Sequence, residues 1–192
     1  MNNWKNYYSR HLTREPREEV RNALPFCTKK RWALDLGAGT LIESRFLIEY
    51  GFANVVAVDS CYEVKSFASN FDTKKFTLVL ESFDSYQFPT NRFDFITAQF
   101  SLPFYGKKSF RQFFQAIVDS LTTGGVFTAQ LFGELDDWNT EDSKLIFHTE
   151  TQAKKLLSDL VILDFKIINK EGFTASGEFK HWHVFNFIAK KV

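Results

Sequence analysis

Two glycines and two aspartates have a spacing that could bind a nucleotide-like cofactor. Gly37 and Gly39 follow an apolar run that ends with Asp35 and Leu36, and a second apolar run ends at Asp59, 20 residues beyond Gly39. Glycines let the chain turn tightly and let a ligand approach without meeting a Cβ atom, while a carboxylate at that distance can accept hydrogen bonds from a ribose diol. The pattern predicts a strand, a glycine turn and a helix start that hold a cofactor.

The turn fits a nicotinamide cofactor poorly. That fingerprint needs glycine or alanine at the sixth position of the turn, where this chain has Ile42. Asp35 adds a negative charge at the end of the first run, where it would repel a pyrophosphate and attract a cationic sulfonium. The residues therefore favour a sulfonium cofactor, and a turn that binds no ligand is the structural alternative.

The segment 35–40 resembles motif I of class I S-adenosylmethionine (SAM) dependent methyltransferases, and Val55–Asp59 resembles their motif II. Leu41 departs from the pattern, because many members carry a third glycine there. Three further segments, 99–104, 124–127 and 180–185, look like the small bacterial methyltransferases of the tellurite-resistance and small-molecule type. The resemblance implies an enzyme of class EC 2.1.1.- with a Rossmann-like three-layer α/β/α sandwich, whose seven-stranded, mostly parallel sheet has an antiparallel last strand.

Alternating apolar runs and helix starts independently predict a parallel sheet covered by helices. Strands are expected at 32–36, 55–59, 76–80, 93–98 and 126–132. The runs 161–169 and 182–189 have no helix-length segment between them and should form an antiparallel hairpin at the sheet edge. A helix is expected from near Pro16 to before Pro25. Capping boxes, in which Ser or Thr pairs with Glu or Gln three residues later, are predicted at Thr40, Ser60, Ser109 and Thr149.

Length and composition indicate one domain, residues 1–192, with 44% hydrophobic residues. The resemblance implies an N-terminal helical lid segment over 1–30 and a SAM-binding core over 31–192. Lys plus Arg at 24 nearly balance Asp plus Glu at 23, so no overall field attracts nucleic acid or a membrane. Apolar runs are shorter than the ~20 residues of a membrane span, and the N-terminus lacks the core of a signal peptide. Two cysteines without metal or disulfide spacing suit a reducing compartment. We therefore expect a cytoplasmic protein, and the oligomeric state stays open.

Ligands of open parallel sheets bind beyond the carboxyl ends of the strands. The resemblance places the methionine moiety on the glycine turn, the ribose on Asp59 and the adenine near Ser60, Phe83 and Asp84, the last of which could instead be a turn former. Gln99 could face the sulfonium or fasten its own loop. The predicted cofactor-binding residues are Asp35, Leu36, Gly37, Ala38, Gly39, Asp59, Ser60, Phe83, Asp84 and Gln99. Valine at Gly37 should block binding and leave the fold largely intact.

The acceptor side carries fewer signals, because methyl transfer is an in-line displacement that needs a general base only for a protonated nucleophile. Aromatic faces can stabilise a sulfonium methyl, and Tyr7, Tyr8 and Phe104 are the predicted substrate-binding residues. Arg14 or Arg17 could pair with the SAM carboxylate, or be solvated helix charges.

Two histidines of the last predicted strand are the catalytic candidates. His181 and His183 share one face of that strand, and either could act as a base or bind the acceptor, with a structural pair as the alternative. No metal is expected, because no third ligand has a recognisable spacing.

The sequence thus predicts a SAM-dependent methyltransferase that acts on a small-molecule acceptor. The alternatives are an RNA or protein methyltransferase and a non-catalytic SAM-binding protein. The near-zero net charge and the lack of an Asn-Pro-Pro-Tyr type motif after the fourth strand disfavour a macromolecular acceptor.

Overall fold

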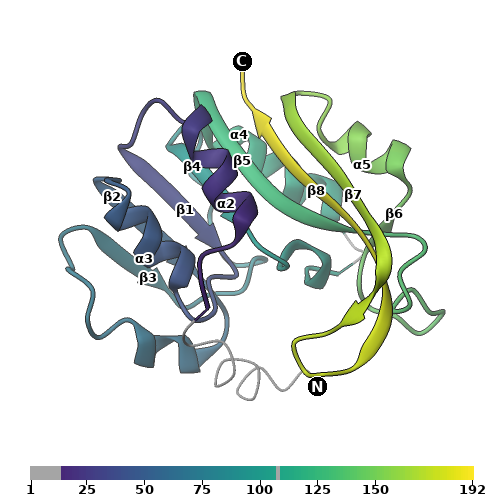
Figure 1. Cartoon of the computed structure of the whole chain (residues 1–192). Coiled ribbons are helices and arrows are strands. Elements are labelled where there is room, and N and C mark those ends of the chain that lie inside the picture. The colour runs from purple at the N-terminus through teal and green to yellow at the C-terminus, as the bar shows by residue number, and fades with distance from the viewer. Residues whose placement is uncertain (1–13, 107–108) are drawn as a thin grey trace.

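The chain forms one twisted sheet with helices on both faces in a computed structural model that describes residues 14–106 and 109–192 (Figure 1). The strand order is β3-β2-β1-β4-β5-β8-β7. Pairings from β3 through β5 are parallel, and β8 runs antiparallel to both β5 and β7. The strands are β1 (Trp32–Leu36), β2 (Asn54–Val58), β3 (Phe76–Val79), β4 (Phe93–Ala98), β5 (Leu121–Gly133), β6 (Phe147–His148), β7 (Val161–Phe173) and β8 (Phe179–Lys190).

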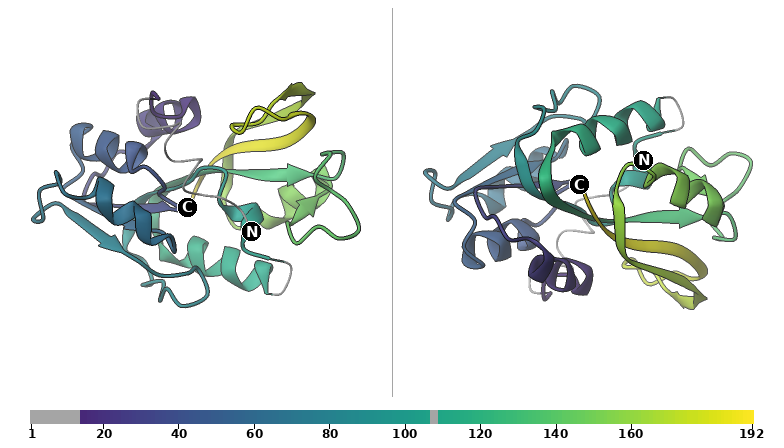
Figure 2. Two further views of the ribbon diagram at one scale, coloured as in Figure 1. Left: turned by 90° about the horizontal axis from the view of Figure 1, so that it is seen from below. Right: turned by 90° about the horizontal axis from the view of Figure 1, so that it is seen from above.

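Two apolar clusters make this a three-layer sandwich. On one face Val20 of α2 (Glu18–Ala23) and Leu47 of α3 (Ile42–Glu49) pack with Phe95 of the sheet. On the other face Phe114 of α4 (Phe110–Ser120) and Ala153 of α5 (Glu150–Leu156) pack with its opposite side. Figure 2 shows the helices on both sides of the sheet. Short 3₁₀ helices are η1 (Leu24–Phe26), η2 (Tyr62–Phe67) and η3 (Leu102–Phe104).

The predicted fold class is confirmed, and the terminal hairpin forms at the sheet edge as expected. The short strand β6, which pairs with the end of β5, adds an eighth strand. The first described helix begins at Glu18, and Pro25 follows in η1, where the missing proline N–H is tolerated. None of the described helices has the length and apolarity to cross a bilayer.

Three of the four predicted capping boxes are wrong. The one at α5 is present, since Thr149 Oγ1 accepts the N–H of Gln152 at 3.1 Å and the Gln152 side chain accepts the N–H of Thr149 at 2.9 Å. In contrast, α3 begins after Leu41 and α4 after Ser109, with φ of 61° and 65°. A capping side chain requires an extended backbone, which these left-handed residues do not have. The third predicted start, at Ser60, becomes the 3₁₀ helix η2.

Candidate functional site

The glycine turn is fastened to the end of β2. Gly37 and Gly39 have φ of 71° and 52°, in the left-handed region that favours glycine. The Gly37 N–H donates to the carbonyl of Val58 at 2.8 Å, and the Gly39 N–H donates to Asp59 Oδ2 at 2.9 Å. The turn and the predicted ribose acid therefore lie together at the carboxyl end of the sheet.

The structure gives a further steric reason for glycine at position 37. A Cβ atom there would lie 2.3 Å from the Cβ of Ser101. Ser101 lies in the loop after β4, directly after Phe100. Ser101 is itself held in place, since its Oγ donates to the carbonyl of Leu36 at 2.7 Å. The expectation that valine at Gly37 would leave the fold largely intact is wrong, because the added atoms would first collide with the protein.

Leu41 occupies the position where many methyltransferases have a third glycine, and it takes a glycine-like conformation. Its φ is 61°, and its side chain is buried in the cluster beneath α2 and α3. Burial of a leucine contributes about 1.5–3 kcal/mol, which can offset the ~1–2 kcal/mol cost of a left-handed residue. The turn therefore keeps its shape without the third glycine.

Asp59 joins the turn to the residues that follow β2. Its second carboxylate oxygen, Oδ1, accepts the N–H of Cys61 at 2.8 Å, and the residue is 8% exposed. Burial raises the pKa of Asp59, while the backbone N–H groups that bind the carboxylate act in the opposite direction. Each oxygen keeps a second lone pair that can accept a further hydrogen bond. Ser60 is exposed beside it.

Asp35 lies beneath the turn. It is 2% exposed, and its Oδ2 accepts the hydroxyl proton of Ser44 on α3 at 2.7 Å. Burial, reinforced by the nearby Glu43 carboxylate, raises the pKa of Asp35 to about 7. Leu36 and Ala38 are buried around it. The Asp35 side chain thus connects the end of β1 to α3.

Phe83 lies beside the glycine turn, whereas Asp84 lies beside Tyr105. The Phe83 ring reaches to 3.5 Å from the position of a Cβ on Gly37 and stacks on Phe113 with ring centroids 5.3 Å apart. Asp84 is exposed and hydrogen-bonds Tyr105, whose pKa is raised by burial and by this carboxylate. The structure thus brings Phe83 close to the glycine turn.

Gln99 fastens the chain after β4. Its Nε2 donates to Thr97 Oγ1 at 2.9 Å, and its Oε1 accepts from Gln130 Nε2 at 2.8 Å. Gln130 Oε1 in turn accepts the N–H of Phe100 at 2.9 Å, which holds Phe100 at a left-handed φ of 52°. These contacts favour the loop-fastening interpretation of Gln99, and Gln130 is a site residue that the sequence analysis missed.

The two arginines before α2 differ in what they bind. Arg14 makes a two-pronged ion pair with Glu43, with N–O distances of 2.6 and 2.5 Å, and the N–H of Arg17 also donates to Glu43 at 3.1 Å. The Arg17 guanidinium lies 4.7 Å from the centroid of the Phe100 ring. Its Nε is buried without a hydrogen-bond partner among the described residues. Arg17 therefore keeps a donor beside the loop that follows β4.

An aromatic wall, defined here as Phe100, Phe104, Phe132, Trp138 and Trp182, follows the carboxyl ends of β4 and β5. Phe132 is buried at its centre, and the other four rings are half-buried. Behind it, the buried Lys180 ammonium pairs with Asp136 and lies 4.0 and 3.9 Å from the ring centroids of Trp138 and Trp182. Burial lowers the pKa of Lys180, and Asp136 opposes that shift.

Both candidate histidines have protein partners. His183 is 7% exposed, its Nδ1 accepts the N–H of Leu135 at 3.1 Å, and its ring fills the space above Gly133. The His181 ring lies between Glu171 and Asn169 of β7, at 3.0 and 2.5 Å. These contacts favour the structural pair over a catalytic role. Tyr7 and Tyr8 lie outside the described residues.

Comparison with known proteins shows which family and fold this chain resembles. A family model described as a methyltransferase domain matches residues 34–129. No curated protein sequence matches the chain. The structure of TehB from Haemophilus influenzae superimposes with a TM-score of 0.78 at 17% identity, over 98% of this chain and 67% of that one.

Two other solved structures are similar. A putative S-adenosylmethionine dependent methyltransferase from Listeria monocytogenes gives a TM-score of 0.71 at 14% identity, over 91% of this chain and 96% of that one. The Burkholderia thailandensis 1,6-didemethyltoxoflavin-N1-methyltransferase, with 1,6-didemethyltoxoflavin and S-adenosylhomocysteine bound, gives 0.68 at 17% identity, over 100% and 81%. At these identities the likeness shows a shared fold.

Proposed function

Because this chain belongs to the methyltransferase-domain family and is a SAM-dependent methyltransferase, we propose that its methyl acceptor is a small molecule. The observation that carries the proposal is the aromatic wall beside the loop that follows β4. Four half-buried rings around Phe132 offer flat apolar surfaces that suit a small, largely apolar or aromatic acceptor. Phe100, whose ring centroid lies 6.2 Å from that of Trp182 in an edge contact, directly precedes Ser101 and so connects this wall to the glycine turn.

The residues of the turn fit SAM. Asp59 has lone pairs left for the two ribose hydroxyls, and Phe83 offers a ring edge for the adenine. The buried Nε of Arg17, which lacks a partner among the described residues, supports this arginine as the group that binds the SAM carboxylate. Arg14 is less suited to that role, since Glu43 already takes both of its terminal nitrogens.

SAM supplies the methyl group and the positive sulfonium, so the chain has to align the acceptor and exclude water. The Gln99 and Gln130 amides fix the backbone of Phe100, which sets one ring of the aromatic wall relative to the turn. Lys180 and Asp136 hold Trp138 and Trp182 in place from behind. A near-attack alignment on a rigid wall requires no general base when the acceptor is already deprotonated.

The cofactor half of the proposal is tested by calorimetry with S-adenosylhomocysteine. Asp59→Ala should weaken binding by about 1–3 kcal/mol, the cost of leaving ribose hydroxyls without their charged partner. Asp72→Ala, at an exposed carboxylate of the loop before β3, is the matched control and should bind like the wild type. Equal affinities for all three proteins would remove Asp59 from the site.

The acceptor half is tested by incubating the protein with SAM labelled in its methyl group and cell extract. The extract is separated into small-molecule, RNA and protein fractions, and label should enter the small-molecule fraction. More label in RNA or protein than in the same extract incubated without the protein would overturn the small-molecule acceptor. If the protein binds S-adenosylhomocysteine but no fraction becomes labelled, the result would support the non-catalytic alternative.

A further inference from the structure

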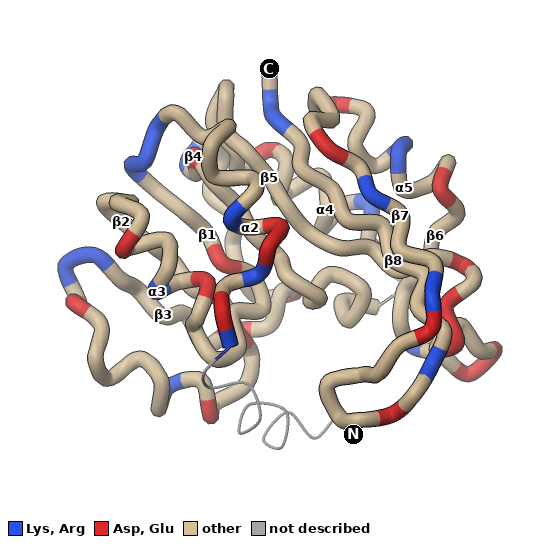
Figure 3. The backbone as a smooth tube through the Cα atoms, viewed as in Figure 1, with Lys and Arg blue, Asp and Glu red and all other residues tan. Residues whose placement is uncertain are grey.

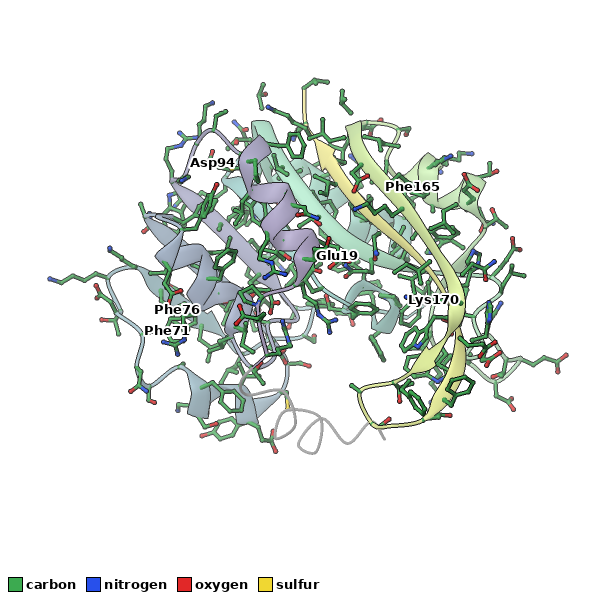
Figure 4. The ribbon with its side chains drawn as sticks, in the orientation of Figure 1. Glu19, Phe71, Phe76, Asp94, Phe165 and Lys170 are labelled. Atoms are coloured by element: carbon green, nitrogen blue, oxygen red, sulfur yellow. The ribbon has the colours of Figure 1, made fainter. Side chains whose placement is uncertain are left out.

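A groove separate from the predicted cofactor site lies between α2 and the last two strands. It has a volume of about 410 Å³, within the ~300–1,000 Å³ of small-molecule sites. Glu18 and Glu19 of α2 form one wall, and Asp164 and Lys166 of β7 belong to the other. Figure 4 shows Glu19 on the side of α2 towards β8. None of the predicted cofactor-binding residues lines this groove.

The groove carries more acidic than basic groups, and the excess lies on the α2 wall. Three carboxylates and one ammonium leave a net charge of −2 from these four groups. Neither Glu18 nor Glu19 has an ion-pair partner within residues 14–106 and 109–192. Figure 3 shows the acidic positions in the first turn of α2, between basic positions of the same segment. Lys166 pairs with Asp164 at 3.5 Å, and both side chains are well exposed at 59% and 39%. Such a surface pair contributes little and is easily displaced by another cation.

The floor of the groove contains an unsatisfied amide. Asn186 and Ile188 of β8 alternate with Phe185 and Phe187, which belong to the apolar cluster on the opposite face, so the Asn186 side chain faces α2. Asn186 is 6% exposed, and its Oδ1 has no hydrogen-bond partner among the described residues. A buried amide oxygen without a donor costs about 1–3 kcal/mol. A ligand that brings an N–H group to the floor would remove that cost.

The arrangement suits an organic cation with an aliphatic body. In the described part of the chain no group of three His, Cys, Asp or Glu side chains could hold a metal ion, so the carboxylates are too dispersed for one. Ile168 of β7 and Ile188 of β8 add apolar side chains to the lining. A ligand with ammonium groups at both ends and methylenes between them would match walls and floor together.

We propose that the groove between α2, β7 and β8 binds a linear aliphatic polyamine. Its terminal ammonium groups lie on the carboxylates of α2 on one wall and on Asp164 on the other, and an N–H donates to the side-chain Oδ1 of Asn186. Lys166 competes for Asp164 and limits the affinity.

Calorimetry with the full chain and spermidine tests this site. Glu19→Gln should weaken binding by about fivefold or more, because it removes one charge-assisted contact. Lys166→Met should strengthen binding by about threefold, because it frees Asp164 and removes a like charge. Glu150→Gln on α5, across the sheet, is the matched control with the same change in net charge and should bind like the wild type. The Asn186 side-chain amide resonance should also shift on addition of spermidine.

Several outcomes would overturn the proposal. If Glu19→Gln and Glu150→Gln weaken binding equally, the attraction is a general charge effect. If 1,8-octanediol, which has a similar length but no charge, binds as well as spermidine, the carboxylates do not recognise the ligand. Unchanged affinity in Lys166→Met together with an unshifted Asn186 resonance would place spermidine elsewhere.

Discussion

The contact between Gly37 and Ser101 gives a stringent test of how the glycine turn is built. A Cβ atom at position 37 would lie 2.3 Å from the Ser101 Cβ, far inside van der Waals contact. Gly37→Ala should therefore destabilise the protein even in the absence of any ligand. Changing Ser101 to glycine removes the atom that is struck, so the double variant should recover part of the loss.

The expected magnitudes follow from the two causes. An alanine at φ of 71° costs about 1–2 kcal/mol, and overpacking against Ser101 costs about 1–3 kcal/mol, which gives roughly 2–5 kcal/mol for Gly37→Ala. Ser101→Gly alone loses the hydrogen bond to the Leu36 carbonyl and gains backbone freedom, at about 1–2 kcal/mol. Since only the overpacking part is shared, the double variant should be about 1–3 kcal/mol more stable than additivity predicts.

Urea unfolding of the wild type, both single variants and the double variant measures this coupling. Calorimetry with S-adenosylhomocysteine then separates two kinds of crowding. If the Cβ at 37 also occupies ligand volume, the double variant regains stability while its affinity stays low. A coupling free energy within ~0.5 kcal/mol of zero would refute the reasoning, because it would mean that position 37 and Ser101 do not meet.

Two further predictions concern pH and the histidine beside β5. Asp35 has a raised pKa of about 7 against 3.8 in the unfolded chain, so its stabilising contribution is complete below about pH 3.8 and decreases as pH rises to about 7. Relative to Asp35→Asn, which cannot ionise, the wild type should lose up to ~4 kcal/mol of unfolding free energy between pH 4 and 7. Urea unfolding at each pH measures this free energy for both proteins, and parallel plots of it against pH would contradict the prediction. His183→Ala should lower stability by about 2–4 kcal/mol, because it opens a cavity over Gly133 and leaves the Leu135 N–H without its acceptor, while turnover per folded molecule stays constant. Loss of turnover with an unchanged melting temperature would restore the catalytic assignment.

Much of the fold could be predicted because its signals are local. The runs that became β1 and β4 are apolar on both faces, as buried parallel strands require, and their observed bounds equal the predicted ones. The hairpin of β7 and β8 followed from the lack of any helix-length segment between its strands. Helix starts were harder, because a capping pattern does not reveal whether the residue at the start has an extended backbone. Leu41 and Ser109 are left-handed, and for the buried Leu41 tertiary packing supports that conformation.

The site residues also divide into those with a local sequence signal and those whose role depends on tertiary contacts. Asp59 could be predicted from its separation from the glycines along the sequence, and in the structure its carboxylate accepts the N–H of Gly39. Ser101 and Gln130 gave no sequence signal, because their roles depend on contacts between strands that are far apart in the chain. Glu43 looked like half of a capping box, but its carboxylate accepts hydrogen bonds from Arg14 and from the Arg17 backbone instead.

These long-range contacts explain why a turn that departs from the family pattern keeps its shape. Gly37 lies against Ser101, Gly39 binds Asp59, and Leu41 is buried under the helices, so every second residue of the turn is held by a different element. Phe100, next to Ser101, is likewise held in a left-handed conformation by Gln130 on β5. Conformations that cost about 1–3 kcal/mol each persist only where the surroundings determine them. The cofactor edge is therefore set by the packing of β2, β4 and β5 around the turn, and a third glycine is not required.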